Sequence, residues 1–198
     1  MNPALILLLS SIVLGSVLLG RQALSTGSAT LPSSGAARFP DVSGANLQRA
    51  EYQLPADFEG ELNLVMVAFR RQQQQLVNTW LPLARELEAE HEGLAYYELP
   101  VVYDGGAMAR TYLDNVMRAG IPDPKARATT ITLYTDVSSF VTALDLGTTR
   151  NIHVLLVDRT GTVHWRTSGA LDAAAEQSLR ETLAERKGGG GAGSAKVV

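Results

Sequence analysis

Residues able to bind a ligand or a partner gather directly after an apolar run near the middle of the chain. Arg70 and Arg71 precede four glutamines, at a position where the pattern predicts that a helix begins. Backbone N–H groups at a helix N-terminus attract anions, and arginine pairs well with carboxylate and phosphate groups. Arg70, Arg71, Gln73 and Gln74 are therefore candidate binding residues, either for a small anion or for polar groups of a partner protein. A solvated helix start without a ligand is the alternative interpretation.

His153 is the fifth candidate binding residue, expected to lie across from the loop that contains the other four. It is also the candidate for acid–base chemistry, because imidazole titrates near neutral pH and can bind metal ions. A histidine that only hydrogen-bonds a backbone group at a strand end is the alternative. The histidines stand at positions 91, 153 and 164, and none has the spacing of a zinc site. We therefore expect no metal site and no cofactor. A cysteine-independent enzyme centred on His153, either a hydrolase or a metal-dependent one, is the less favoured alternative.

The composition excludes several classes of protein. The chain of 198 residues contains no cysteine, so it has no disulfide, no thiol nucleophile and no cysteine-ligated metal. Thiol–disulfide oxidoreductase and thiol peroxidase activities are excluded for the same reason. The 17 Lys and Arg stand against 20 Asp and Glu, which gives a formal net charge of -3. Nucleic-acid binding is not expected, because it requires clustered positive charge.

The two ends differ in composition from the body between them. Residues 4–20 are apolar or small apart from three serines, and the small residues Ala23 and Ser25 then resemble a signal-peptidase site. We predict a signal peptide or N-terminal membrane anchor at 1–25, a flexible linker at 26–38, a folded domain at 39–186 and a disordered glycine-rich tail at 187–198. This organisation predicts a location in the bacterial periplasm, free or anchored to the inner membrane, where a cysteine-free exported protein is ordinary.

The body alternates predicted strands and helices. Apolar runs predict strands, and apolar residues that recur every three or four positions predict helices. The predicted strands are 62–69, 94–102, 129–134, 152–158 and 162–167. The predicted helices are 72–90, 105–119, 138–146 and 171–186, with a kink or restart at Pro82 and a loop at 121–128. The order predicts an α/β fold with a mixed central sheet flanked by helices and a C-terminal β-hairpin and helix.

This order of elements resembles the thioredoxin-like superfamily, especially its membrane-tethered and peroxiredoxin-like branches. Two spacings carry the resemblance. Phe69 ends the first central strand and Pro82 follows thirteen residues later, as the helix-kinking proline of thioredoxins does, which places the two active cysteines of the family at Gln74 and Val77. His153 lies eight residues before the glycine of the predicted hairpin, where the family has a cis-proline. The resemblance implies a redox-inactive member that lacks both active-site cysteines.

A narrower similarity links the chain to thioredoxin-like proteins related to the mitochondrial ATP synthase assembly factor. It is carried by Phe39-Pro40, by the segment 63–69, and by Gln73-Gln74 followed by 77–80. These relatives act as chaperones on a membrane partner. The resemblance therefore implies a non-catalytic protein-binding module, associated with the membrane through its N-terminal segment, that assists the assembly of a membrane complex. The expected contact surface is the face on which relatives carry out thiol chemistry.

Overall fold

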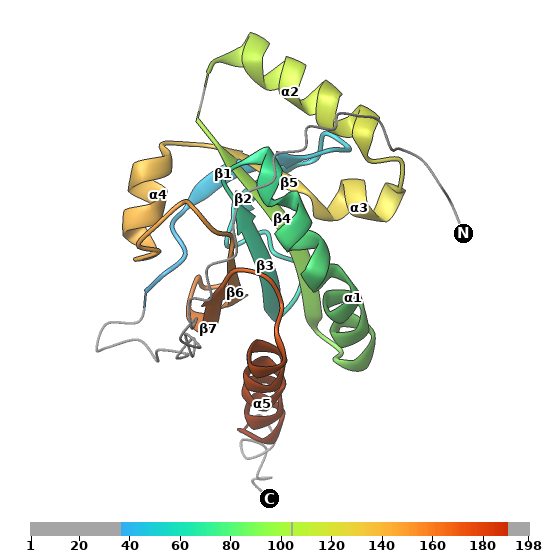
Figure 1. Ribbon diagram of the computed structural model, residues 1–198, viewed down its shortest axis with the longest axis vertical. Coiled ribbons are helices and arrows are strands. Elements are labelled where there is room, and N and C mark those ends of the chain that lie inside the picture. Colours follow the sequence, from blue (N-terminus) through green and yellow to red (C-terminus); the bar gives the residue numbers. More distant parts are fainter. Residues whose placement is uncertain (1–36, 104, 190–198) are drawn as a thin grey trace, which may run out of the picture.

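The computed structural model of the chain describes residues 37–103 and 105–189 (Figure 1). The predicted signal peptide or anchor, nearly all of the predicted linker and residues 190–198 of the predicted tail lie outside the described residues. None of the described helices is both long and apolar enough to cross a membrane.

Seven strands and five α-helices make up the described part of the chain, with one short 3-10 helix, η1, before the first of them. The strands are β1 (Val42–Asn46), β2 (Glu51–Leu54), β3 (Leu62–Ala68), β4 (Leu94–Val102), β5 (Ile131–Tyr134), β6 (His153–Asp158) and β7 (Val163–Ser168). The helices are η1 (Arg71–Gln73), α1 (Gln74–Glu90), α2 (Ala107–Gly120), α3 (Pro124–Thr129), α4 (Val137–Ala143) and α5 (Ala173–Gly189).

The strands form one mixed sheet in the order β2-β1-β5-β4-β3-β6-β7. The central strands β3, β4 and β5 run parallel, as helical crossovers require. β6 pairs antiparallel with β3, β7 with β6, and β1 with both β2 and β5. Figure 1 shows the parallel strands at the centre of the sheet. Their carboxyl ends point toward the end of the molecule where α2 lies.

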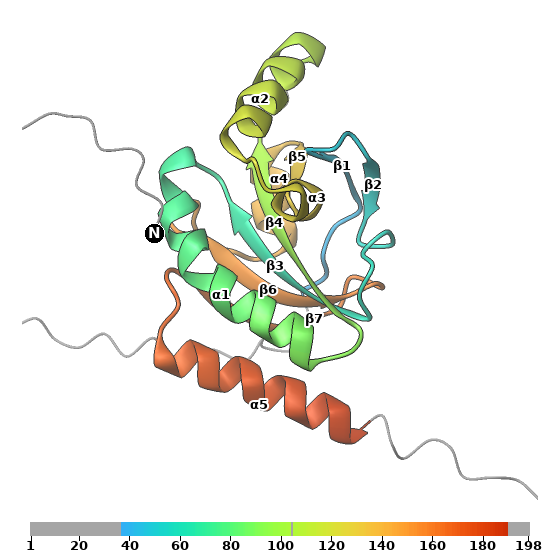
Figure 2. The same ribbon diagram turned by 90° about the vertical axis from the view of Figure 1, so that its right-hand side faces the viewer.

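Helices cover both faces of this sheet and enclose two apolar clusters. Figure 2 shows α1 and α5 side by side on one face, whereas α4 lies on the other. The α1 and α5 side buries Trp80 and Trp165, whose ring centroids lie 6.1 Å apart. The opposite side packs Phe140 of α4 against Phe39, with centroids 5.7 Å apart, beneath the β1–β2 hairpin. The burial of these aromatic side chains supplies much of the apolar area that stabilises the fold.

The predicted strands and helices are found in the predicted order, and the structure adds two strands, β1 and β2, that were not predicted. Four further details differ. The segment 121–128, predicted as a loop, contains α3, because Asp123 caps the helix by accepting from the Lys125 N–H and Pro124 occupies its first turn. Helix α1 runs through Pro82 as one element, with the proline on its exposed side. Gly120 is the last residue of α2 and does not follow the end of the helix. Helix α5 continues to Gly189, three residues into the predicted tail.

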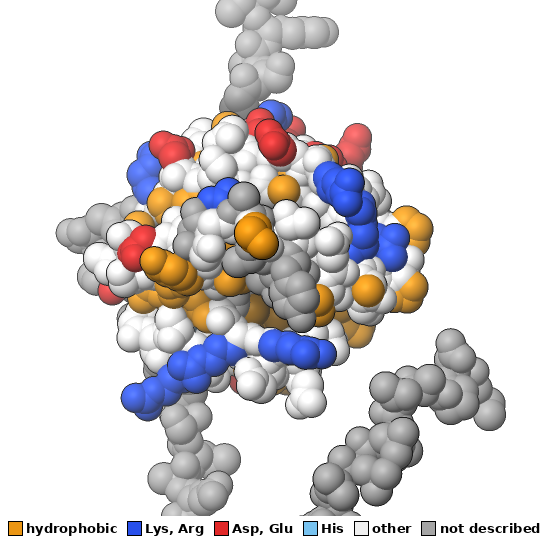
Figure 3. Space-filling model, turned by 90° about the horizontal axis from the view of Figure 1, so that it is seen from above, with side chains coloured by type: hydrophobic (Ala, Val, Ile, Leu, Met, Phe, Trp, Pro, Cys, Tyr) orange, Lys and Arg blue, Asp and Glu red, His pale blue; other side chains and the backbone are white. Residues whose placement is uncertain are grey.

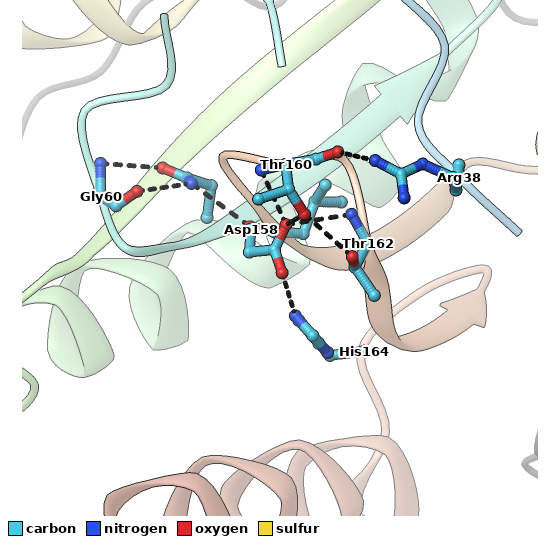
Figure 4. A network of polar contacts seen from close by, with 8 residues as sticks. Arg38, Gly60, Asp158, Thr160, Thr162 and His164 are labelled. Carbon is cyan, nitrogen blue, oxygen red and sulfur yellow. Dashed lines mark hydrogen bonds and ion pairs between the residues drawn. The ribbon is translucent and has the colours of Figure 1, made fainter. Parts of the chain in front are cut away.

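The turn between β6 and β7 is held by one carboxylate (Figure 4). Asp158 Oδ1 accepts hydrogen bonds from the Thr160 N–H at 2.8 Å and from the Thr162 N–H at 3.0 Å, and Oδ2 lies 2.7 Å from His164 Nε2. The guanidinium of Arg38 donates to the Thr160 carbonyl and joins the start of the domain to this turn. Burial raises the pKa of Asp158, but the hydrogen bonds from Thr160, Thr162 and His164 outweigh it and lower the pKa to about 2.

Replacing Asp158 by asparagine tests the contribution of this charge. Asp158→Asn keeps one carbonyl acceptor but cannot accept from His164, so we expect the free energy of unfolding at pH 7 to fall by about 1–3 kcal/mol. A carboxylate with a lowered pKa stabilises the fold above its ordinary pKa of 3.8, and that stability is lost as the pH falls toward 2. Urea titrations of both proteins between pH 7 and pH 2.5 measure this. A difference in stability that does not shrink below pH 3.8 would contradict the assignment.

Candidate functional site

The predicted site residues come together at one edge of the sheet. β3 leads into η1 and α1, which carry Arg70, Arg71, Gln73 and Gln74. β6 runs antiparallel to β3 with His153 opposite Val67, so the start of β6 lies beside the end of β3. The structure therefore brings all five residues to the end of the molecule at which the parallel strands finish. In open α/β sheets, ligands bind at this carboxyl end.

Arg70 and Arg71 are the charged residues of this group, and like Gln74 they are exposed. Both side chains are exposed to solvent, and neither forms an ion pair in the portion of the chain that the structure describes. The sequence around them contains no acidic residue between Glu61 and Glu86. The two exposed guanidinium groups are therefore available to carboxylates of another molecule.

Gln73 is buried, and both the oxygen and the nitrogen of its amide form hydrogen bonds inside the protein. Its Oε1 accepts from the Phe69 N–H at 2.8 Å and from the Arg70 N–H at 3.2 Å. Its Nε2 donates to the Thr149 carbonyl at 2.9 Å. These contacts occupy the backbone N–H groups of Phe69 and Arg70, directly before η1 begins. The amide of Gln73 therefore fixes the loop between β3 and α1 to the segment that precedes β6.

His153 makes a similar contact with the same segment. Its side chain is buried, and its Nε2 lies 2.7 Å from the Thr148 carbonyl oxygen. Its ring packs against the Phe69 ring in a T-shaped arrangement, with the two ring centroids 6.2 Å apart. Because a carbonyl only accepts, Nε2 carries the proton and the neutral ring leaves Nδ1 unprotonated. Burial lowers the pKa of His153, an effect that the Thr148 contact opposes and the charge of Arg166 reinforces. The peptide bond before His153 is trans, unlike that of the cis-proline at the matching position of the thioredoxin-like superfamily. Among the described residues, the cis peptide bond is the one between Leu54 and Pro55.

Glu98 is the polar residue of this region that sequence reasoning missed. It lies on β4 with 7% of its surface exposed, and its Oε2 accepts from Gln74 Nε2 at 2.8 Å. Burial raises the pKa of Glu98, while the Gln74 hydrogen bond and the charge of Arg85 partly offset the effect. A carboxylate within the apolar run 94–102 is the signal that could have found it, since buried carboxylates are rare without a partner.

Apolar side chains are exposed beside this edge, on and before α2. Tyr103 is 72% exposed, Met108 90% and Val116 43%. Figure 3 views this end of the molecule and shows orange apolar side chains around a hollow, with blue Lys and Arg side chains at its rim. Exposed apolar side chains that gather beside polar ones are typical of a surface that contacts another protein.

The groups at this edge can supply binding contacts. No group of three or more His, Cys, Asp or Glu able to hold a metal ion occurs among residues 37–103 and 105–189. His153, the candidate base, donates to a backbone carbonyl and is buried. The exposed groups at this edge are guanidinium, amide and apolar side chains, which supply ionic, hydrogen-bonding and apolar contacts.

The buried histidine gives a pH dependence that can be measured. A base whose pKa is lowered by folding stays neutral in the folded chain, so stability falls as the pH drops below the ordinary value of 6.5. In His153→Gln the new amide can still donate to the Thr148 carbonyl but does not titrate. We expect thermal melts to show that the wild-type chain loses more stability than the variant between pH 7 and pH 5. Parallel loss in both proteins would contradict a buried neutral histidine.

Comparisons with known proteins identify the fold of the chain. No family model matches the chain, and no curated protein matches it. Among solved structures it is similar to BsSco, a member of the Sco family of cytochrome c oxidase assembly proteins, with 12% identity and a TM-score of 0.52 over 77% of this chain and 95% of that chain. It is also similar to a putative electron transport protein from Aquifex aeolicus VF5, with 11% identity and a TM-score of 0.50 over 78% of this chain and 99% of that chain.

A third similar structure is the pneumococcal exposed lipoprotein thioredoxin Etrx1 from Streptococcus pneumoniae strain TIGR4, with 17% identity and a TM-score of 0.48 over 74% of this chain and 99% of that chain. Identities this low establish the fold alone. The predicted fold class is confirmed: the chain has the thioredoxin-like fold, and it contains no cysteine with which to carry out the thiol chemistry of that fold.

Proposed function

We propose that this chain is a non-catalytic thioredoxin-like module that binds a partner protein through the edge at which β3 and β4 end. The module is exported or membrane-tethered and assists the assembly or stability of a membrane complex. Arg70, Arg71 and Gln74 contact the partner, while Gln73 and His153 hold the surface in place. The partner is a protein in the membrane or at its periplasmic surface.

The observation that carries the proposal is the chemistry of the exposed groups at this edge. Arg70 and Arg71 have no ion-pair partner among the described residues, and three large apolar side chains around α2 are exposed. Arginine and large apolar or aromatic side chains are the groups that contribute most to protein interfaces. A surface of this kind supports binding to another polypeptide with acidic and apolar residues.

The setting at a membrane is supported by the sequence and by one structural neighbour. The apolar segment 4–20 has the composition of a signal peptide or an anchor, and the linker after it is long enough to allow movement near a membrane. BsSco belongs to a family of cytochrome c oxidase assembly proteins. An assembly role for the present chain is thus compatible with its fold and does not require cysteine, because binding alone can stabilise a partner.

The two other hypotheses for this edge have weaker support. An anion at the helix start would find one of the donors there, the Arg70 N–H, already bonded to Gln73 Oε1. An enzyme centred on His153 would need this ring to exchange protons with a substrate, whereas it is buried and hydrogen-bonded to Thr148. Protein binding requires neither group to be free.

Crosslinking and capture from native membranes test the proposal. The full-length chain carries Arg70→Ala together with Arg71→Ala, and the matched control carries Arg159→Ala with Arg186→Ala, two exposed arginines on the hairpin and on α5. We expect a defined membrane protein to be captured by wild type and control, and its yield to fall about tenfold or more in the Arg70 and Arg71 variant, because arginine anchors carry much of an interface's energy. Equal loss in the control, or no captured protein with wild type, would refute the proposal.

A further inference from the structure

The carboxylate of Glu98 is buried with fewer partners than it can accept. An ionised carboxylate accepts up to about four hydrogen bonds, whereas Glu98 accepts one, from Gln74 Nε2, within the described parts of the chain. No ion pair of Glu98 occurs in the same region. Arg85 is close enough to influence its charge, but its guanidinium hydrogen-bonds Tyr96. Burying a charge with so few partners costs stability, so this arrangement is not explained by the needs of the fold.

A buried group without a hydrogen-bond partner lies on the same face of the sheet as Glu98. Thr132 of β5 is fully buried, and its Oγ1 is the buried side-chain atom without a hydrogen-bond partner among the described residues. β4 and β5 run parallel with Glu98 bridged to Thr130, and alternate residues of a strand share a face. Glu98 and Thr132 therefore face the same side, opposite Leu133, which lies in the apolar cluster on the α4 side.

Exposed side chains of α1 lie between Glu98 and the solvent. Gln74 and Asn78 are exposed on the first two turns of α1, and Gln74 Nε2 bridges Asn78 Oδ1 at 3.1 Å and Glu98 Oε2 at 2.8 Å. Rotation of the Gln74 side chain costs two hydrogen bonds and exposes the carboxylate. The exposed Tyr103 follows directly after the end of β4, the strand that carries Glu98. The buried carboxylate of Glu98 and the exposed ring of Tyr103 thus belong to one continuous segment of the chain.

We propose that Glu98, together with Thr132, is a receptor site for one lysine or arginine side chain of the partner protein, with apolar neighbours of that residue resting on Tyr103 and α2. This inference deepens the proposed function and rests on it. The entering cation replaces the Gln74 amide at Oε2 and pairs with the carboxylate, and its remaining N–H groups reach the Thr132 hydroxyl. Arg70 and Arg71, at the rim, then pair with acidic residues elsewhere in the partner.

A cation is the group that fits the chemistry of this site. A neutral donor would gain only an ordinary hydrogen bond, whereas a cation also removes the cost of the unpaired buried charge. Burial raises the pKa of Glu98, and a bound cation lowers it again by favouring the ionised form. An anion would be repelled by the same carboxylate, so the site distinguishes partners by charge.

Two defined peptides test the site directly. The probes are fluorescein-labelled Leu-Leu-Arg-Leu-Leu and Leu-Leu-Gln-Leu-Leu, titrated against the full-length chain in detergent by fluorescence polarisation. We expect wild type to bind the arginine peptide about tenfold more tightly than the glutamine peptide, the size expected of a charge-assisted hydrogen bond. Glu98→Gln should abolish the preference and Thr132→Val should reduce it about threefold, the size of a neutral hydrogen bond. Glu92→Gln, an exposed control, should keep it.

An equal preference for arginine in wild type and Glu98→Gln would overturn the inference, as would equal binding of both peptides to wild type. Capture from membranes with Glu98→Gln separates this failure from failure of the proposed function. If the variant captures the partner as well as wild type does, protein binding stands and the receptor site is wrong. If wild type captures no partner, the proposed function itself fails. Thermal melts of Glu98→Gln and Thr132→Val at pH 7 check that both variants are folded.

Discussion

The buried amide of Gln73 is the contact on which the candidate surface depends. It ties the last residues of the β3 segment to the start of the helical region and ties both to Thr149. His153 adds a second connection from the first residue of β6 to Thr148. Three segments far apart in the sequence are thereby fixed at one edge without a disulfide or a metal. A surface held in this way loses little conformational entropy when it binds.

Two buried polar residues near this edge, Glu98 and Thr132, are not explained by the stability of the fold. Both are buried on one face of the sheet: Glu98 accepts one hydrogen bond, and Thr132 Oγ1 has no partner among the described residues. A fold selected only for stability would replace both residues by apolar ones. Glu98 lies halfway along β4 and Thr132 near the start of β5, on the face of the sheet that α1 covers, and the proposed receptor site gives the cost of burying them a functional reason.

Most of the architecture could be predicted because its signals were local and strong, whereas the short strands β1 and β2 contain no continuous apolar run and were missed. The run 62–69 and the stripe containing Trp80 identify β3 and α1 without further information. Helix α3 was missed because the two prolines around Asp123 indicate a loop unless the capping role of that aspartate is recognised. Burial of Gln73 could not be predicted, since four successive glutamines look alike and only the turn of η1 selects the one that points inward. Glu98 was missed for a related reason, because its partners come from other elements.

The central claim is that the edge formed by β3, β4 and α2 contacts another protein. The most direct measurement places a photo-reactive amino acid at Met108, which is 90% exposed on α2, and irradiates cells that express the full-length chain. The account predicts a defined membrane-protein adduct from position 108 and none from position 92, an exposed residue after α1 at the opposite end of the sheet. Adducts from position 92 with none from position 108 would contradict it.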